Sequence, residues 1–222
     1  SESGPFRRAY TRMHELFSKL RAEGLTLERL DLGGGLGIPY GDSEEPLVGP
    51  MEYAEIVRDI FSDFDGKLIF EPGRVIAGNA GVLVTRVIYL KEGATRDFVI
   101  VDAAMNDLAR PSLYDAFHEI VPVNITDVDS EVVPYDVVGP ICETGDTFCT
   151  QRKLPRLAAG DLLAIRSAGA YGATMASSYN TRALIPEVMV RGKDYSIIRR
   201  RMEVDDLLDL EMFPAWLSNN PD

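Results

Sequence analysis

The chain has 222 residues, 45% of them hydrophobic, and a formal net charge of −12 at pH 7. This composition suits one large or two modest folded domains and argues against intrinsic disorder. The acidic balance disfavours nucleic acid and anionic membrane surfaces as partners, and no apolar run is long enough to span a bilayer. The two cysteines, Cys142 and Cys149, are too few for a disulfide framework, fit a reducing cytoplasm, and with no histidine near them predict no metal site.

The first part of the chain predicts two βα units. An amphipathic helix begins near Pro5 and ends at Gly24, because apolar residues recur there at helical spacing. A short apolar strand follows at residues 29–32. A second amphipathic helix begins at Pro50 and leads to a second apolar strand at residues 67–70. Short buried strands joined by a helix are typical of a parallel sheet.

Both predicted strands end abruptly in glycine-containing loops. The first glycine loop (residues 33–37, GGGLG) and the second glycine loop (residues 71–74, EPGR) offer backbone amides that a bulky anion can approach closely. Two neighbouring strand ends of this kind match the phosphate site of a (β/α)8 barrel. There Glu71 would point into the active-site mouth, where a carboxylate can keep a pyridine nitrogen protonated. Taken singly, GGG is equally compatible with a structural turn, and Glu71 with an ion pair to Arg74 across the turn.

From residue 82 onward, short strands alternate with turn signals, which predicts an antiparallel barrel or sandwich with short helices. The predicted strands are residues 82–90, 97–101, 119–123, 132–138, 161–167, 183–190 and 195–200. Turn signals at residues 91–94 and 192–194 predict hairpins, residues 203–210 predict a short helix, and the tail after Pro214 is expected to be loose.

The predicted domains are therefore residues 1–81, the C-terminal portion of a (β/α)8 barrel, and residues 82–222, a β-domain. Because two βα units cannot close a barrel, we expect the chain to be a fragment whose remaining barrel lies upstream.

Three further loops carry candidate chemistry. Arg110 and Tyr114 lie four residues apart in a predicted loop and suit a substrate carboxylate. Cys142 and Glu143 lie together in a glycine-bounded loop, and Tyr171 lies between glycines at a strand end, where its phenol can reach a phosphate oxygen. The bland alternatives are ordinary surface polarity, an inert cysteine and a packed aromatic ring.

In this order and at these spacings, GGGLG, EPGR, RPSLYDAFHEI, GPICETGD and AGAYG closely resemble the diaminopimelate decarboxylases. These are pyridoxal 5'-phosphate enzymes of the alanine-racemase-like class, also called fold type III. The resemblance covers roughly residues 5–213. It implies a barrel followed by a β-domain, a cytoplasmic homodimer with shared active sites, and decarboxylation of meso-2,6-diaminopimelate to L-lysine and CO2, the last step of lysine biosynthesis.

The resemblance also implies a role for each motif. The cofactor phosphate would be bound through backbone amides of five residues of the two loops, namely Gly33, Gly34, Gly35, Gly73 and Arg74. Glu71 and Tyr171 would also bind the cofactor, with Tyr171 reaching the phosphate. The substrate would be contacted by Arg74, Arg110, Tyr114, Glu143 and Tyr171. Glu71 would lie at the pyridine nitrogen and Cys142 would be the proton donor. Cys142 and Glu143 would act in the partner subunit's site.

The family's Schiff-base lysine and its ring-stacking histidine belong to the early barrel, and no lysine here occupies the matching position. The lysines present are Lys19, Lys67, Lys91, Lys153 and Lys193. We therefore expect the fragment alone to be inactive. Rival substrates are ornithine, arginine or a carboxylated polyamine, but these end in a cation, whereas Arg110 beside Tyr114 favours a distal carboxylate. A racemase is disfavoured because racemases of this class lack the Cys-Glu-x-Gly-Asp loop. A truncated, non-catalytic binding module is the alternative from another class.

Overall fold

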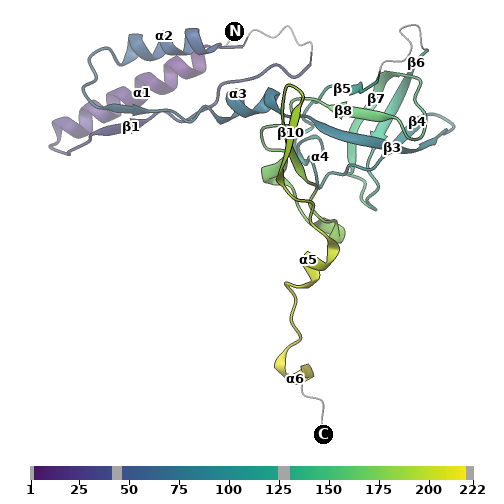
Figure 1. Cartoon of the computed structure of the whole chain (residues 1–222). Helices are drawn as coiled ribbons and strands as arrows, with labels where there is room; N and C mark the ends of the chain where they lie inside the picture. Colours follow the sequence, from purple (N-terminus) through teal and green to yellow (C-terminus); the bar gives the residue numbers. More distant parts are fainter. Residues whose placement is uncertain (1–2, 42–46, 125–130, 219–222) are drawn as a thin grey trace. The chain divides into compact units, whose positions relative to one another are not determined.

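The computed structural model describes residues 3–41, 47–124 and 131–218 (Figure 1). The chain forms two compact units. The first unit runs up to Val82 and includes the later segments 117–120 and 165–170, whereas the second unit consists of residues 83–116, 121–164 and 171 onward. The predicted domain boundary after residue 81 took no account of those two segments and stays a prediction.

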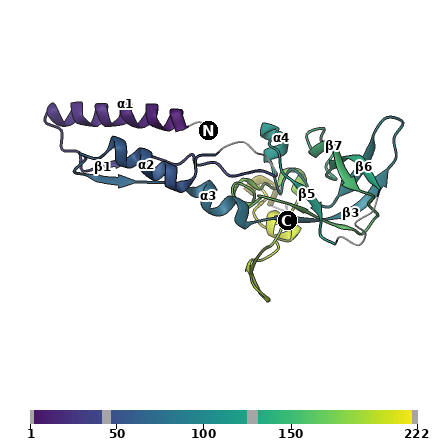
Figure 2. The same ribbon diagram turned by 90° about the horizontal axis from the view of Figure 1, so that it is seen from above.

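The first unit contains two helices packed together and two short parallel strands. Its elements are α1 (Ser3–Ala22), β1 (Arg29–Asp31), α2 (Pro50–Ile60), β2 (Lys67–Ile69), α3 (Gly73–Ala77) and the 3-10 turn η1 (Gly78–Ala80). Leu30 of β1 lies opposite Leu68 of β2, which confirms the predicted parallel pairing. The helices α1 and α2 lie side by side (Figure 2).

An aromatic cluster holds the two helices together. Tyr10 of α1 and Tyr53 of α2 share a hydrogen bond of 2.7 Å between their hydroxyls, and Phe6 meets the Tyr53 ring edge-on at 5.4 Å between ring centroids. Such edge-to-face pairs add about 1 kcal/mol each to the free energy gained by burial. The cluster continues into the buried residues Leu32 and Ile56 and so anchors the strand that leads to the first glycine loop.

The large sheet has six strands in the order β5-β8-β3-β4-β6-β7. These are β3 (Leu83–Lys91), β4 (Asp97–Val101), β5 (Ile120–Pro122), β6 (Val132–Val138), β7 (Thr147–Pro155) and β8 (Leu162–Ile165). Its core residues Val87, Val99, Val137 and Leu163 are almost completely buried. The predicted hairpin at residues 91–94 is confirmed, since β3 and β4 pair antiparallel.

The remaining elements of the second unit are short. They are α4 (Arg110–Tyr114), the 3-10 turns η2 (Ala173–Met175) and η3 (Tyr179–Thr181), β9 (Glu187–Arg191), β10 (Asp194–Arg199), α5 (Val204–Leu208) and α6 (Ala215–Ser218). The hairpin predicted at residues 192–194 is confirmed by the antiparallel pairing of β9 and β10.

Four details of the prediction are wrong. The sheet is mixed rather than antiparallel throughout, because β4 pairs parallel with β6. The nine-residue strand β7 was not predicted. Residues 110–114 form a helix rather than a loop, since Pro111 suits the first helical turn. The tail after Pro214 contains α6, with residues 219–222 outside the described part.

Within the described ranges, no helix combines the length and apolar character needed to cross a bilayer.

Candidate functional site

The two glycine loops of the first unit are joined backbone to backbone. The amide of Leu32 donates to the carbonyl of Ile69 at 2.9 Å, and the amide of Glu71 donates to the carbonyl of Gly33 at 2.8 Å. Gly34 makes this approach possible, because a Cβ there would lie 2.3 Å from the carbonyl oxygen of Glu71. The strand ends predicted to be neighbours are therefore in direct contact.

The five glycine-loop residues predicted to bind an anion through backbone amides differ in what they offer. The amide of Gly33 donates to the Asp31 carboxylate at 2.8 Å, and the amide of Gly73 donates to the carbonyl of Glu71 at 2.8 Å. Among the described residues, the amides of Gly34 and Gly35 have no hydrogen-bond partner. A Cβ at Gly33 or Gly73 would meet nothing within 4 Å. Gly33 and Gly73 thus provide open space beside the loops, and Gly34 and Gly35 provide unbonded amides.

Arg74 ties the second glycine loop to the first. Its Nε donates to the carbonyl of Leu36 at 3.2 Å and its Nη2 donates to the carbonyl of Gly35 at 3.3 Å. In the part of the chain that the structure describes, Arg74 forms no ion pair with Glu71, whose side chain is exposed. The alternative that these two residues merely pair across a turn is therefore wrong.

A second group of predicted site residues lies together in the second unit. Arg110 and Tyr114 lie four residues apart on α4, so both side chains project from one face of that helix. The Arg110 guanidinium lies 5.7 Å from the centre of the Tyr171 ring, within range of a cation–π interaction. Tyr171 has a φ of +66°, a left-handed conformation that is uncommon for a tyrosine.

The Cys142 loop (residues 139–146) contacts α4 through Ser112, whose Oγ donates to the carbonyl of Gly145. Cys142 is exposed at the surface of this loop. Glu143 bonds within the loop, because its Oε1 accepts from the amide of Gly145 at 3.2 Å. The structure therefore brings α4, with Arg110 and Tyr114, next to the loop that contains Cys142 and Glu143.

Sequence reasoning assigned no role to three polar residues behind this group. Asn106 and Asp146 are buried at 2% and 3% exposure, and Tyr179 lies in η3 with its hydroxyl 3.5 Å from Oε2 of Glu143. The available signal was weak: Asn106-Asp107 after a strand, and an aspartate that closes the glycine-bounded loop. The burial of Asn106 and Asp146 became visible only in the folded chain.

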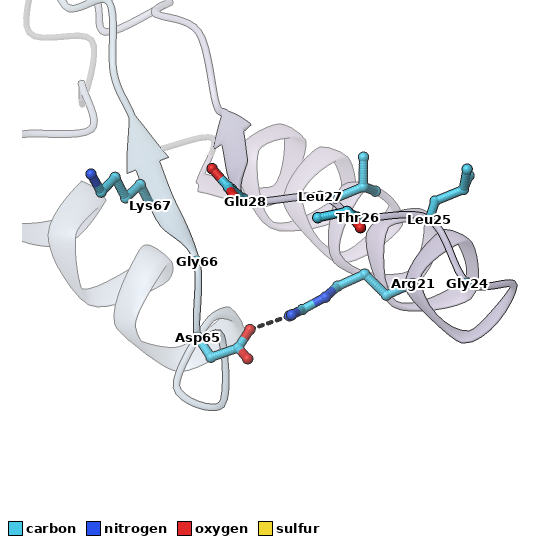
Figure 3. A pocket seen from close by; sticks show the side chains of 9 residues that line it. All are labelled: Arg21, Gly24, Leu25, Thr26, Leu27, Glu28, Asp65, Gly66 and Lys67. Atoms are coloured by element: carbon cyan, nitrogen blue, oxygen red, sulfur yellow. Dashed lines mark hydrogen bonds and ion pairs between the residues drawn. The ribbon is translucent and has the colours of Figure 1, made fainter.

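An open hollow in the first unit lies away from the predicted residues (Figure 3). It is lined by residues from the end of α1 and from the amino ends of β1 and β2, such as Glu28 and Lys67. An ion pair between Arg21 and Asp65 spans it, and the hydrogen bond from Arg21 lowers the pKa of Asp65. The glycine loops lie at the opposite, carboxyl ends of the strands, where barrel enzymes have their active sites. Residues at the amino ends of barrel strands, such as those that line the hollow, contribute to stability rather than to catalysis.

No group of three or more histidine, cysteine, aspartate or glutamate side chains able to hold a metal ion occurs in the described residues.

Comparisons with known proteins define the class. Residues 16–169 match the family described as pyridoxal-dependent decarboxylase, C-terminal sheet domain. The chain belongs to this family, and the predicted resemblance and fold class are confirmed.

The similar curated proteins are diaminopimelate decarboxylases. The one from Zymomonas mobilis is 46% identical over 217 residues, which are 98% of this chain and 51% of that protein. The one from Pseudomonas aeruginosa is 50% identical over 203 residues, 91% of this chain and 48% of that protein. The chain thus spans about half the length of the curated relatives it matches.

Solved structures agree. Diaminopimelate decarboxylase from Helicobacter pylori, complexed with L-lysine, is 40% identical to this chain with a TM-score of 0.85. The match covers 93% of this chain and 50% of the Helicobacter pylori chain. AQ1208 from Aquifex aeolicus is 42% identical with a TM-score of 0.88 over 95% of this chain and 51% of its own. An arginine decarboxylase from Paramecium bursaria Chlorella virus is more distant, at 25% identity and a TM-score of 0.68 over 79% of this chain and 48% of its own.

Proposed function

We propose that the gene product carrying this chain decarboxylates meso-2,6-diaminopimelate to L-lysine and CO2 with pyridoxal 5'-phosphate. The observation that carries the proposal is the arrangement of Arg110 and Tyr114 on one face of α4. A guanidinium and a phenol side by side suit a carboxylate at the far end of a substrate. The names of the relatives at 46% and 50% identity support the same substrate.

The first unit has the features that a phosphate group needs. The unbonded amides of Gly34 and Gly35 donate hydrogen bonds, and the open space at Gly33 and Gly73 admits the ligand. Arg74 holds the two loops together through hydrogen bonds to the carbonyls of Gly35 and Leu36. When bound, pyridoxal phosphate supplies an electron sink for cleavage of the bond to the carboxyl carbon. Glu71 would hold the proton on the pyridine nitrogen, and the Tyr171 phenol would contact the phosphate.

The second unit supplies the groups that meet the substrate. Arg110 and Tyr114, together with Arg74, would bind the distal carboxylate, and Tyr171 would lie beside it. The Glu143 carboxylate would accept the distal ammonium group, and the Cys142 thiol, exposed on its loop, would deliver a proton to the carbon that has lost CO2. Binding fixes the geometry, and the cofactor performs the bond chemistry.

The proposal includes a cytoplasmic homodimer in which Cys142 and Glu143 act in the partner's site. Two observations support the shared site: the Cys142 thiol is exposed, and the Glu143 carboxylate lies on the same surface loop. The resemblance to the diaminopimelate decarboxylases implies active sites that two subunits share.

A decarboxylase acting on ornithine, arginine or a carboxylated polyamine is the second candidate. The arginine decarboxylase among the related structures, at 25% identity, favours this class as a whole. The distal ends of these substrates are cations, which Arg110 would repel. A non-catalytic binding module is the candidate from another class.

The test uses the complete gene product, loaded with pyridoxal phosphate and followed by CO2 release. We expect release from meso-diaminopimelate and little from ornithine or arginine. Glu71→Gln should lower kcat by about 100-fold, the usual effect of losing one group that stabilises developing charge, while the cofactor stays bound. Glu55→Gln, on the exposed side of α2, is the matched control.

Wild-type turnover in Glu71→Gln would refute the role of that carboxylate. Turnover of arginine or ornithine in place of diaminopimelate would establish the second candidate. Cofactor absorbance without CO2 release from any of these substrates would establish the binding module.

A further inference from the structure

Two neighbouring residues, Met105 and Asn106, anchor two separate segments of the second unit. The amide of Met105 donates to Oδ1 of Asp146 at 2.6 Å and so holds the Cys142 loop. Asn106 bonds to the Tyr179 turn (residues 177–181): its Nδ2 donates to the carbonyls of Ser177 and Tyr179, both at 2.9 Å. The amide of Ser177 donates back to the carbonyl of Asn106 at 3.0 Å.

The Asn106 side chain can face the Tyr179 turn in only one orientation. Both acceptors are backbone carbonyls, which cannot donate, so the amide nitrogen must point at them. Its Oδ1 is buried without a hydrogen-bond partner among the described residues. Buried polar atoms are rarely left without a hydrogen bond. The two hydrogen bonds that Nδ2 donates to the Tyr179 turn therefore outweigh the cost of leaving Oδ1 without one.

The Tyr179 turn needs such an anchor because it is strained. Asn180 and Thr181 are consecutive non-glycine residues with φ of +55° and +56°. Asparagine tolerates the left-handed conformation, but for the β-branched threonine it is unfavourable and persists only where surrounding contacts impose it. The bonds from Asn106 on the residues just before are contacts of this kind.

Asp146 fixes the other segment. Besides Met105, its carboxylate accepts from the amide of Ile141 at 2.8 Å, and it is buried at 3% exposure. Gly139 lies against it, since a Cβ at residue 139 would lie 2.2 Å from the carboxylate. The buried Asp146 carboxylate therefore fixes the loop from which Glu143 projects.

The anchored segments meet at one contact, where the Tyr179 hydroxyl lies 3.5 Å from Oε2 of Glu143. The other oxygen of Glu143 accepts from the amide of Gly145 at 3.2 Å. We propose that Tyr179 is a positioning residue that donates a hydrogen bond to Glu143 and orients its carboxylate toward the substrate's ammonium group. Asn106 and Asp146 hold the two partners at that distance. The inference rests on the proposed function for the role of Glu143.

A double-mutant cycle in the complete, cofactor-loaded gene product tests the contact. Tyr179→Phe removes only the hydroxyl, and we expect the KM for meso-diaminopimelate to rise roughly fivefold, the worth of one hydrogen bond, with kcat unchanged within twofold. In a Glu143→Ala background the same change should have no further effect on KM, because no acceptor for the Tyr179 hydroxyl remains at position 143. Tyr195→Phe, at a tyrosine of β10 that is 78% exposed, is the matched control.

An unchanged KM in Tyr179→Phe would overturn the inference. So would a fivefold rise that persists in the Glu143→Ala background, because it would mark a structural effect of the phenol.

Hydrogen exchange separates this inference from the proposed function. In Tyr179→Phe the amide of Gly145 should exchange faster, since its acceptor Glu143 has lost a second restraint, and in Asn106→Ala residues 177–181 should exchange faster. If the wild type releases no CO2 from diaminopimelate, the proposed function fails, and exchange alone decides: acceleration at Gly145 in Tyr179→Phe supports the positioning role, and unchanged exchange there overturns it. Should Asn106→Ala fail to fold, exchange at Gly145 in Tyr179→Phe still tests the positioning role.

Discussion

The two units position their candidate residues by different means. In the first unit the main chain does it, because the amide of Glu71 donates to the carbonyl of Gly33 and Gly34 permits the approach. In the second unit buried polar side chains do it: Asp146 and Asn106 each reach backbone groups of a distant segment. The first unit should therefore be disturbed when a glycine gains a side chain, because a Cβ would push the loops apart. The second unit should be disturbed when a buried polar side chain is truncated, because its hydrogen bonds are lost.

This difference also explains what each unit can vary. Backbone contacts leave the side chains of the glycine loops free for a ligand, provided that the critical glycine stays. As far as the fold is concerned, side-chain anchors leave the other positions of the Cys142 loop and of the Tyr179 turn open to change, provided that Asp146, Asn106 and the closely packed Gly139 stay. Four experiments test the contrast.

The largest effect is expected from Gly34→Ala in the first unit. The new methyl group would overlap the carbonyl oxygen of Glu71, a backbone atom that cannot move without separating the loops. The free energy of unfolding should fall by about 3 kcal/mol, at the upper end for overpacking. Gly73→Ala is the control, since its Cβ meets nothing within 4 Å. Urea denaturation measures both variants, and equal stability of the two would refute the role of Gly34.

In the second unit, Asp146→Ala should cost about 2 kcal/mol, because two part-buried amides lose a charged acceptor. The control is Asp194→Ala, whose ion pair with Arg191 is exposed to solvent. Such surface pairs contribute less than about 1 kcal/mol. If the same denaturation experiment gives both aspartate variants equal stability, side-chain anchoring is not how the second unit holds the Cys142 loop.

The pH dependence of stability gives a smaller effect, with opposite signs at two buried aspartates. Burial tends to raise the pKa of Asp136, but hydrogen bonds from Gln151 and Arg96 outweigh it, so its pKa lies below the ordinary value of 3.8. A lowered pKa in the folded state stabilises the fold above the ordinary value, and this contribution is lost as the pH falls through the lowered pKa. Asp136→Asn should therefore flatten the loss of stability below about pH 4.

Asp107 should behave in the opposite way. Burial raises its pKa despite hydrogen bonds from the amide of Ala104 and from Arg182. Its contribution is present below the ordinary value and is lost as the pH rises through the raised pKa. Asp107→Asn should flatten the curve above pH 4 rather than below it, as measured by denaturation across pH 2–7. Identical curves for the two variants would contradict these assignments.

The smallest effect concerns the two thiols of the second unit. Cys142 is exposed, whereas Cys149 is half-buried and burial raises its pKa above the ordinary value of 9.0. Because only the thiolate reacts, iodoacetamide at pH 8 should modify Cys142 at least tenfold faster than Cys149. Peptide mass spectrometry over time measures both rates. In Cys142→Ser only the slow modification of Cys149 should remain. Faster modification of Cys149 would mean that the Cys142 loop is closed over its thiol.

The sequence was a good guide where the pattern is local. The parallel strands and the neighbouring glycine loops follow from apolar runs that end in glycine, and both hairpins follow from turn signals between short strands. The motif spacing identified the family. Strand β7 was not predicted because the polar run Gln151-Arg152-Lys153 interrupts the alternation of apolar and polar residues. It is also an edge strand with a bulge, where Gln151 has a φ of +50°.

The missed parts of the candidate site depend on contacts between distant residues. Asn106 and Asp146 look like ordinary loop residues in the sequence, and only folding shows that they are buried against backbone groups far along the chain. The parallel pairing of β4 with β6 is non-local in the same sense, since no turn signal encodes which strands become neighbours.

The hydroxyl pair of Tyr10 and Tyr53 gives the first unit its own optical reporter. Burial, and then the bond to Tyr53, raise the pKa of Tyr10 well beyond the ordinary value of 10.0. After a jump to alkaline pH, phenols at the protein surface ionise at once, whereas the Tyr10 phenol ionises only after α1 and α2 have separated. The slow phase of tyrosinate absorbance would therefore time the opening of that helix pair without any label.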